Sequence, residues 1–116
     1  MTCPFDGPMA HSNHYLTERL KPFERREWDG RGQSILRWGR ATRLLKACDN
    51  LDAEVLRDIL SDRVNAPIGI CRHNEIHNGS HCGQTICGIV LDPPGRRAWF
   101  TKGPTGEYDW DEYEVD

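Results

Sequence analysis

The sequence contains no long apolar stretch. Only 37% of its 116 residues are hydrophobic, and no segment approaches the roughly twenty apolar residues of a membrane-spanning helix. The first twenty residues include prolines, histidines and an aspartate where a signal peptide has an apolar run. The length suits one domain and not two. We therefore predict a cytoplasmic, single-domain protein that has no membrane partner.

The sequence also lacks an excess of positive charge. The formal net charge is −3, and six carboxylates lie within residues 107–116. The other residues have 15 basic and 12 acidic side chains, a balance too small for the basic surface of a nucleic-acid-binding protein. We therefore predict no nucleic-acid partner. We interpret residues 107–116 as a solvated acidic tail, and a pairing surface for a partner is the alternative.

The cysteines do not form a zinc-finger pattern. Five cysteines are an odd number, and without a secretory signal we expect reduced thiols. No pair of potential ligands is matched by a second pair at standard spacing, so we assign no metal ligand and no cofactor. Cysteines and histidines nevertheless crowd into seventeen positions, and a small metal-binding module is an alternative function. These residues are Cys71, His73, His77, His81, Cys82 and Cys87.

Two segments in the middle of the chain have the apolar periodicity of helices. Residues 34–47 predict an amphipathic helix with Ser34 as its N-cap, and residues 52–61 predict a second helix with Asp52 as its N-cap. Residues 21–32 are predicted to form a loop, because they contain a proline and an Asp-Gly-Arg-Gly sequence. We interpret the basic side of the first helix as a solvated face, with an acidic partner as the alternative. Its basic residues are Arg37, Arg40, Arg43 and Lys46.

The C-terminal third of the chain predicts a β-hairpin. Strands are expected at residues 84–91 and 97–102, joined by a turn with Pro94 and Gly95 at the central positions of a type II bend. The first strand has apolar side chains on both faces, so both faces must be covered. The two predicted helices can cover one face of the strand. The layer that covers the other face must come from the N-terminal thirty residues or from another chain. The alternating residues are Ile86 and Val90 on one face, and Cys87, Ile89 and Leu91 on the other.

Three segments of the chain are similar to motifs that occur in the same order in one enzyme family. Residues 11–16, His-Ser-Asn-His-Tyr-Leu, resemble a His-[Ser/Thr]-Asn-His motif, and residues 68–73 resemble an Ile-Cys-Arg-His segment. Residues 84–104 resemble the hairpin that closes those enzymes. On these motifs, residues 7–115 resemble the C-terminal portion of penicillin acyltransferase-like Ntn-hydrolases, which include isopenicillin N acyltransferase and relatives of choloylglycine hydrolase.

The resemblance implies an α+β fold and a type of chemistry. The chain would form the C-terminal part of an αββα sandwich, as an antiparallel hairpin with two helices. In such enzymes a cysteine released by self-cleavage attacks an amide or thioester carbonyl, with its own α-amino group as the base. Water or an amine then resolves the acyl-enzyme, so the family hydrolyses amides or moves acyl groups between amines and coenzyme A.

The resemblance also implies two catalytic residues, Asn13 and Arg72. Asn13 corresponds to the asparagine whose side-chain amide helps to form the oxyanion hole, and one donor of this kind contributes roughly 3–4 kcal/mol. Arg72 corresponds to an arginine that orients the nucleophile and substrate, and a cation beside a thiol favours the thiolate. Without the resemblance, these residues also fit an asparagine that caps a turn and a surface arginine. His11, His14 and His73 lie in the motifs without an assigned role.

The family's nucleophile is not found in this sequence. No Asp-Gly-Cys cleavage sequence is present, and Cys3 follows a threonine. We therefore expect residues 1–116 to be a partial Ntn-hydrolase domain, either a fragment or a split subunit, that is inactive alone. Its partner would be a complementing N-terminal chain, and its substrate an acyl amide or acyl thioester. A non-catalytic interaction protein, using the basic helix or the aromatic residues of the acidic tail, is a further alternative.

Overall fold

The computed structural model describes residues 7–25, 28–77, 79–81 and 83–116. The chain has two compact units, residues 1–49 and residues 50–116. Helices and an antiparallel sheet are both present, so the predicted α+β class is confirmed. Among the described residues, no helix combines the length and the apolar character needed to cross a membrane.

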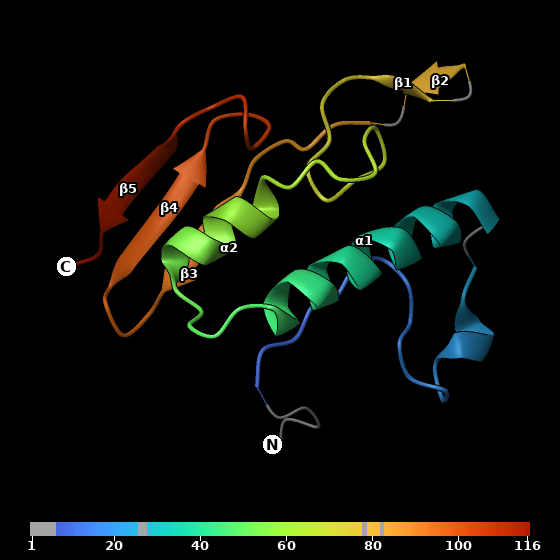
Figure 1. Ribbon diagram of the computed structural model, residues 1–116, viewed down its shortest axis with the longest axis horizontal. Helices are drawn as coiled ribbons and strands as arrows, with labels where there is room; N and C mark the ends of the chain where they lie inside the picture. The colour runs from blue at the N-terminus through green and yellow to red at the C-terminus, as the bar shows by residue number, and fades with distance from the viewer. Residues whose placement is uncertain (1–6, 26–27, 78, 82) are drawn as a thin grey trace. The chain divides into compact units, whose positions relative to one another are not determined.

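The first unit contains a single turn of 3₁₀ helix, η1 (Lys21–Phe23), and the long helix α1 (Trp28–Lys46) (Figure 1). The prediction of a loop throughout residues 21–32 is therefore wrong for residues 28–32. Each glycine in this part of the helix costs only about 1 kcal/mol relative to alanine, which the rest of a 19-residue helix offsets. Ser34 is correspondingly not the N-cap. It lies inside α1 and is fully buried.

The second unit begins with helix α2 (Ala53–Leu60). The prediction of Asp52 as its N-cap is confirmed, because the Asp52 carboxylate accepts a hydrogen bond of 2.9 Å from the Val55 N–H. Ser61 ends the helix, and its backbone N–H and hydroxyl both donate to the Arg57 carbonyl. Farther along the chain, β1 (Ile76–His77) and β2 (Ser80–His81) form a short antiparallel ladder.

A three-stranded antiparallel sheet makes up the rest of the second unit. Its strands are β3 (Ile89–Asp92), β4 (Arg97–Thr101) and β5 (Trp110–Glu114), in the order β3-β4-β5. The predicted hairpin corresponds to β3 and β4, but the first strand is shorter than predicted. Residues 84–88 lie outside it because Thr85 pairs with Arg72, through hydrogen bonds of 2.8 and 2.9 Å that involve both backbones and the Thr85 hydroxyl.

The turn between β3 and β4 differs from the prediction in its backbone geometry. The Arg96 N–H donates to the Pro93 carbonyl over 3.1 Å, so Pro94 and Gly95 occupy the central positions as predicted. A type II bend requires a positive φ at its second central residue, which Gly95 does not have. The positive φ of 55° belongs to Arg96 instead. The Asp92 carboxylate accepts from the Gly95 N–H and stabilises this alternative turn.

Strand β5 shows that residues 107–116, which we interpreted as a solvated acidic tail, are largely exposed but include a paired strand. Residues 110–114 pair with β4 over its whole length, for example Glu112 opposite Trp99. Two cations on the hairpin partly neutralise the acidic strand, because Arg97 lies 3.7 Å from Glu112 and Lys102 lies 3.8 Å from Asp111. Cross-strand pairs of opposite charge favour such a ladder.

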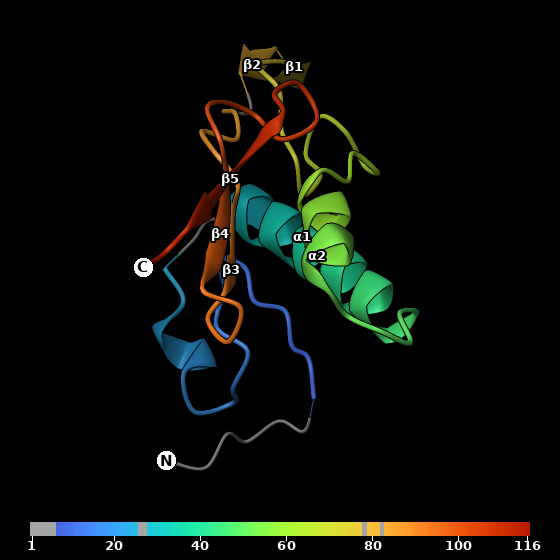
Figure 2. The ribbon, with the colours of Figure 1, turned by 90° about the vertical axis from the view of Figure 1, so that its left-hand side faces the viewer.

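The two faces of this sheet differ in their cover. Helix α2 packs against β3 on one face, where Val90 and Trp99 are each only 4% exposed, and Figure 2 shows α2 on this side of the sheet. The guanidinium groups of Arg57 and Arg97 each lie 5.2 Å from the ring centre of Trp99. The core of the unit therefore lies between α2 and the sheet.

The opposite face, which we call the open face, has apolar side chains that the described residues of the second unit leave partly exposed, although Ala98 is buried. Leu91 is 62% exposed, and Tyr113 packs edge to face on Phe100 with ring centres 5.4 Å apart. The prediction that β3 has apolar side chains on both faces is confirmed for residues 89–91. From the strand register, the apolar residues of the open face are Ile89, Leu91, Ala98, Phe100 and Tyr113, with Val115 just beyond β5, and Asp111 opposite Phe100 lies on the same face.

Candidate functional site

In the first unit, a set of hydrogen bonds holds the predicted His-Ser-Asn-His segment on helix α1. The Ser34 hydroxyl accepts from the Asn13 backbone N–H at 2.7 Å, and it lies 2.8 Å from His14 Nδ1. The Ser12 hydroxyl donates to the Ser34 carbonyl at 2.8 Å and also lies 2.9 Å from Ser34 Oγ. Because Ser34 is fully buried, one helical residue fixes three consecutive residues of an irregular segment. We call residues 12–14 and Ser34 the Ser34 cluster.

His14 is the titratable member of the Ser34 cluster. His14 is buried, and its ring packs edge to face with the ring of Trp38, with the ring centres 5.9 Å apart. Burial lowers the pKa of His14 below its usual 6.5, because the charged imidazolium loses hydration. The nearby cations also lower this pKa, while Glu24 raises it. His14 therefore takes part in the packing and hydrogen bonding of the first unit.

Asn13 presents its side chain at the surface of the first unit. Its amide oxygen accepts a hydrogen bond of 2.7 Å from Arg37 Nη2, and the residue is exposed. An arginine has only donors, so the atom that faces it must be the amide oxygen. Among the described residues, the Asn13 amide N–H₂ group has no hydrogen-bond partner. The arrangement can therefore offer two amide hydrogens to an external acceptor.

Arg72 lies in the second unit, in the segment between α2 and the sheet. Its backbone is fixed to Thr85, and its side chain is half-buried. Asn13 belongs to the first unit and Arg72 to the second. The expectation that both residues are catalytic stays a prediction.

Cys71 and His73, which flank Arg72, contact the loop that leads to β5. The fully buried Cys71 thiol donates to the Thr105 carbonyl at 2.7 Å. His73 Nε2 lies 3.3 Å from the same carbonyl, and His73 Nδ1 lies 2.8 Å from a Glu107 carboxylate oxygen. A buried thiol in such a contact is inaccessible to a substrate. Cys71 and His73 therefore fasten the Thr105 loop to the segment that contains Arg72.

The alternative of a metal-binding module finds no specific support at these residues. Within the part of the chain that the structure describes, no three His, Cys, Asp or Glu residues are grouped to hold a metal ion. Cys82 and the side chains of His77 and His81 lie outside the described set. The module stays a prediction that elemental analysis of chelator-free protein would test.

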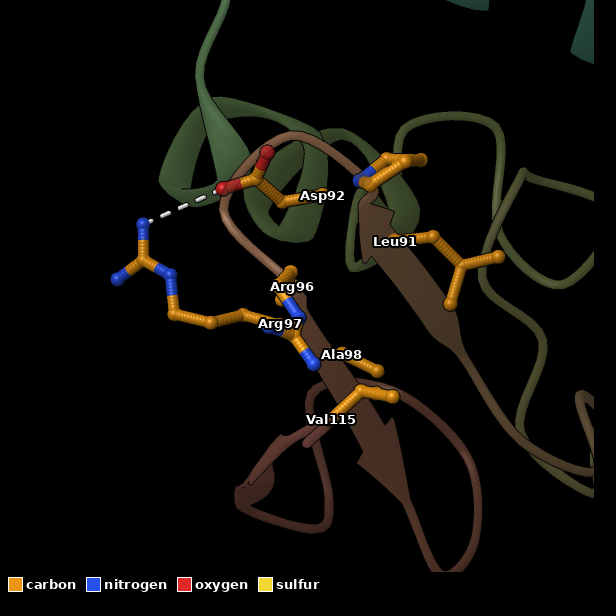
Figure 3. Close-up of a pocket in the computed structure, with 7 residues that line it drawn as sticks. Leu91, Asp92, Arg96, Arg97, Ala98 and Val115 are labelled. Carbon is orange, nitrogen blue, oxygen red and sulfur yellow. Dashed lines mark hydrogen bonds and ion pairs between the residues drawn. The ribbon is translucent and has the colours of Figure 1, made fainter.

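A hollow of about 230 Å³ lies at the turn end of the open face. Its apolar wall includes Leu91, Ala98 and Val115, and Figure 3 shows these side chains beside the ion pair of Asp92 with Arg97. The small Ala98 leaves room between its larger neighbours. A hollow of this size and lining can accept an apolar side chain from a covering layer.

Ser34, Arg37 and Thr105 contribute to these sites in roles that the sequence alone did not reveal. Ser34 lies one helical turn before Trp38, on the apolar stripe of α1. A serine within an apolar stripe was the available signal, since a buried hydroxyl needs a partner. No comparable signal marked Thr105, because its contacts depend on segments far apart in the sequence.

Comparison with known proteins adds no family to this description. No protein-family model matches the sequence, and no curated protein matches it significantly.

Proposed function

We propose that this chain is one part of an amide-hydrolysing or acyl-transferring enzyme of the Ntn type, whose cysteine nucleophile comes from another polypeptide segment. The open face is the observation that carries the proposal. Helix α2 covers one side of the sheet, while Ile89, Leu91 and Tyr113 on the open face are each at least half exposed. An apolar sheet face of this kind requires a further layer. The three motifs suggest which enzyme would provide that layer.

In the proposed reaction, the residues of this chain assist a thiolate that they do not supply. The thiolate of an N-terminal cysteine adds to the acyl carbonyl, and the C–N or C–S bond breaks as the leaving group takes the proton held by the α-amino group. The Asn13 amide hydrogens stabilise the oxyanion of the intermediate. Arg72 favours the thiolate and orients the acyl group. Water or an amine then attacks the acyl-enzyme and releases the thiol.

Complementation tests this proposal. The chain alone is expected to release no product from penicillin V or a bile-acid conjugate. Co-expression with the N-terminal segment of a penicillin acyltransferase-like enzyme, starting at its nucleophilic cysteine, is expected to give a complex that hydrolyses an acyl amide. Asn13→Ala in the complex is expected to lower kcat about 10²–10³-fold. Hydrolysis by the chain alone, or a complex that stays inactive toward acyl amides and acyl thioesters, would contradict the proposal.

A non-catalytic interaction protein is the second candidate, and the open face supports it independently of the motifs. The face and its hollow suit an apolar partner surface whether or not chemistry follows. Two variants separate the candidates. Leu91→Lys is expected to weaken assembly under both functions, whereas Asn13→Ala alters a measurable outcome only if the assembled protein is an enzyme.

A further inference from the structure

The backbone of Asn13 is held before any substrate arrives. Its N–H donates to Ser34 Oγ at 2.7 Å, and the flanking Ser12 and His14 contact the same hydroxyl. Ser34 and Arg37 are three residues apart on α1, so their side chains share one side of the helix. The helix therefore fixes the backbone of Asn13 with one side chain and reaches its amide with the other.

The contact with Arg37 also selects one orientation of the amide. The terminal torsion of asparagine is broad, and a half-turn exchanges the amide oxygen and nitrogen. A guanidinium has donors only, so it can hydrogen-bond to the amide oxygen but not to the amide N–H₂ group. The 2.7 Å hydrogen bond between Arg37 Nη2 and Asn13 Oδ1 thus directs the N–H₂ group to the remaining side.

The positive charge of Arg37 beside the amide oxygen also makes the amide N–H₂ group a stronger donor. A charged donor makes a stronger hydrogen bond than a neutral one, and it draws electron density from the amide nitrogen toward the oxygen. The N–H bonds then become more polar, because successive hydrogen bonds reinforce one another.

We propose that Arg37 is a positioning residue for Asn13. It holds the amide with its hydrogens outward and polarises them toward an acyl oxygen that becomes an oxyanion. Arg37 acts through Asn13 and touches neither the acyl group nor the nucleophile. The inference rests on the proposed function, in which Asn13 is the oxyanion donor. Donors that are fixed in advance contribute most in such sites, since they need no reorganisation during the reaction.

The side-chain amide signals of Asn13 in NMR spectra of the full ¹⁵N-labelled chain provide a direct test. The wild type is expected to show amide hydrogen shifts for this group that are displaced from those of a solvated asparagine. Arg37→Ala is expected to move both toward the values of a solvated asparagine, and Arg37→Lys to retain part of the displacement. Arg43→Ala is the matched control, because Arg43 is an exposed arginine on the same helix, and no change is expected.

The indole signal of Trp38 reports whether each variant retains the folded first unit. If Arg37→Ala loses that signal, Arg37→Gln, which keeps much of the side-chain length, takes its place in the comparison. Asn13 signals that are the same with and without the arginine, in a folded variant, would overturn the inference.

Kinetics of the assembled enzyme separate this inference from the proposed function. Arg37→Ala is expected to lower kcat about tenfold with little change in KM, because its effect passes through a donor to the transition state. If Asn13→Ala removes activity while Arg37→Ala changes neither kcat nor the amide signals, the positioning role fails and the function stands. If the amide signals follow Arg37 but Asn13→Ala keeps full activity, the oxyanion role fails, and the inference fails with it.

Discussion

Ser34 shows how a single buried hydroxyl organises a segment that has no regular secondary structure. It accepts a hydrogen bond from the Asn13 N–H and contacts the side chains of Ser12 and His14. A buried hydroxyl that keeps these partners stabilises the native state, whereas one that loses them costs about 1–3 kcal/mol. The position of the candidate donor Asn13 therefore depends on a residue that never meets a substrate.

At the same scale, the lowered pKa of His14 predicts a pH dependence. The unfolded chain binds a proton at His14 more readily than the folded chain does, so the free energy of unfolding increases with pH. The contribution of His14 is expected to be complete above its ordinary pKa of 6.5 and to fall as the pH drops below that value. Thermal unfolding at several pH values, followed by tryptophan fluorescence, measures this effect.

His14→Gln provides the comparison for the pH experiment. The variant retains a polar side chain without a group that titrates, so the difference between the two unfolding curves isolates His14. A difference that stays constant from pH 7.5 to pH 5 would show that His14 is equally easy to protonate in both states.

Among the secondary-structure elements, α2 offers the clearest test of a local signal. Asp52→Ala removes the acceptor of the Val55 N–H and is expected to lower the free energy of unfolding of the second unit by about 1 kcal/mol. Asp58→Ala is the control, because this exposed aspartate lies near the C-terminal end of the helix. Removing its charge there is expected to be neutral or slightly stabilising. Urea unfolding measures both, and equal losses would refute the capping role.

The elements that could be predicted from the sequence are those that local signals determine. The Asp52 cap and the turn centred on Pro94 and Gly95 are of this kind, since their partners lie within three residues. The start of α1 could not be predicted, because the two glycines before residue 33 locally favour a loop over a helix. Strand β5 was missed because the carboxylates that suggested a solvated tail find their cations on the neighbouring hairpin.

In the candidate site too, local motifs could be recognised from the sequence, whereas contacts between distant residues could not. Asn13 was named from its motif, but its amide orientation depends on Arg37, which lies 24 positions away. Arg72 was also named from its motif, while the threonine that fixes its backbone lies 13 positions later. Spacing in one sequence carries no information about such pairs, so the residues that hold a site are harder to predict than the residues that form it.

For the molecule as a whole, the open face predicts an apolar surface that a dye can detect. The isolated chain is expected to bind anilinonaphthalene sulfonate, and Leu91→Lys is expected to reduce the fluorescence of the bound dye. Because Leu91 is exposed, its substitution should change the free energy of unfolding by no more than about 0.5 kcal/mol. Ile86→Lys is the control, since Ile86 is exposed but lies outside the sheet. Equal losses of fluorescence in both variants would contradict a specific role of the sheet.

Strand β5 has one further consequence, which concerns sideways growth of the sheet. Within the described part of the chain it pairs with β4 on one side only, and three of its five residues are acidic. A strand with an unpaired edge can template fibrils, and like charges along that edge oppose the addition of an identical strand. The carboxylates of β5 thus oppose polymerisation along the margin of a sheet that has apolar side chains on its open face.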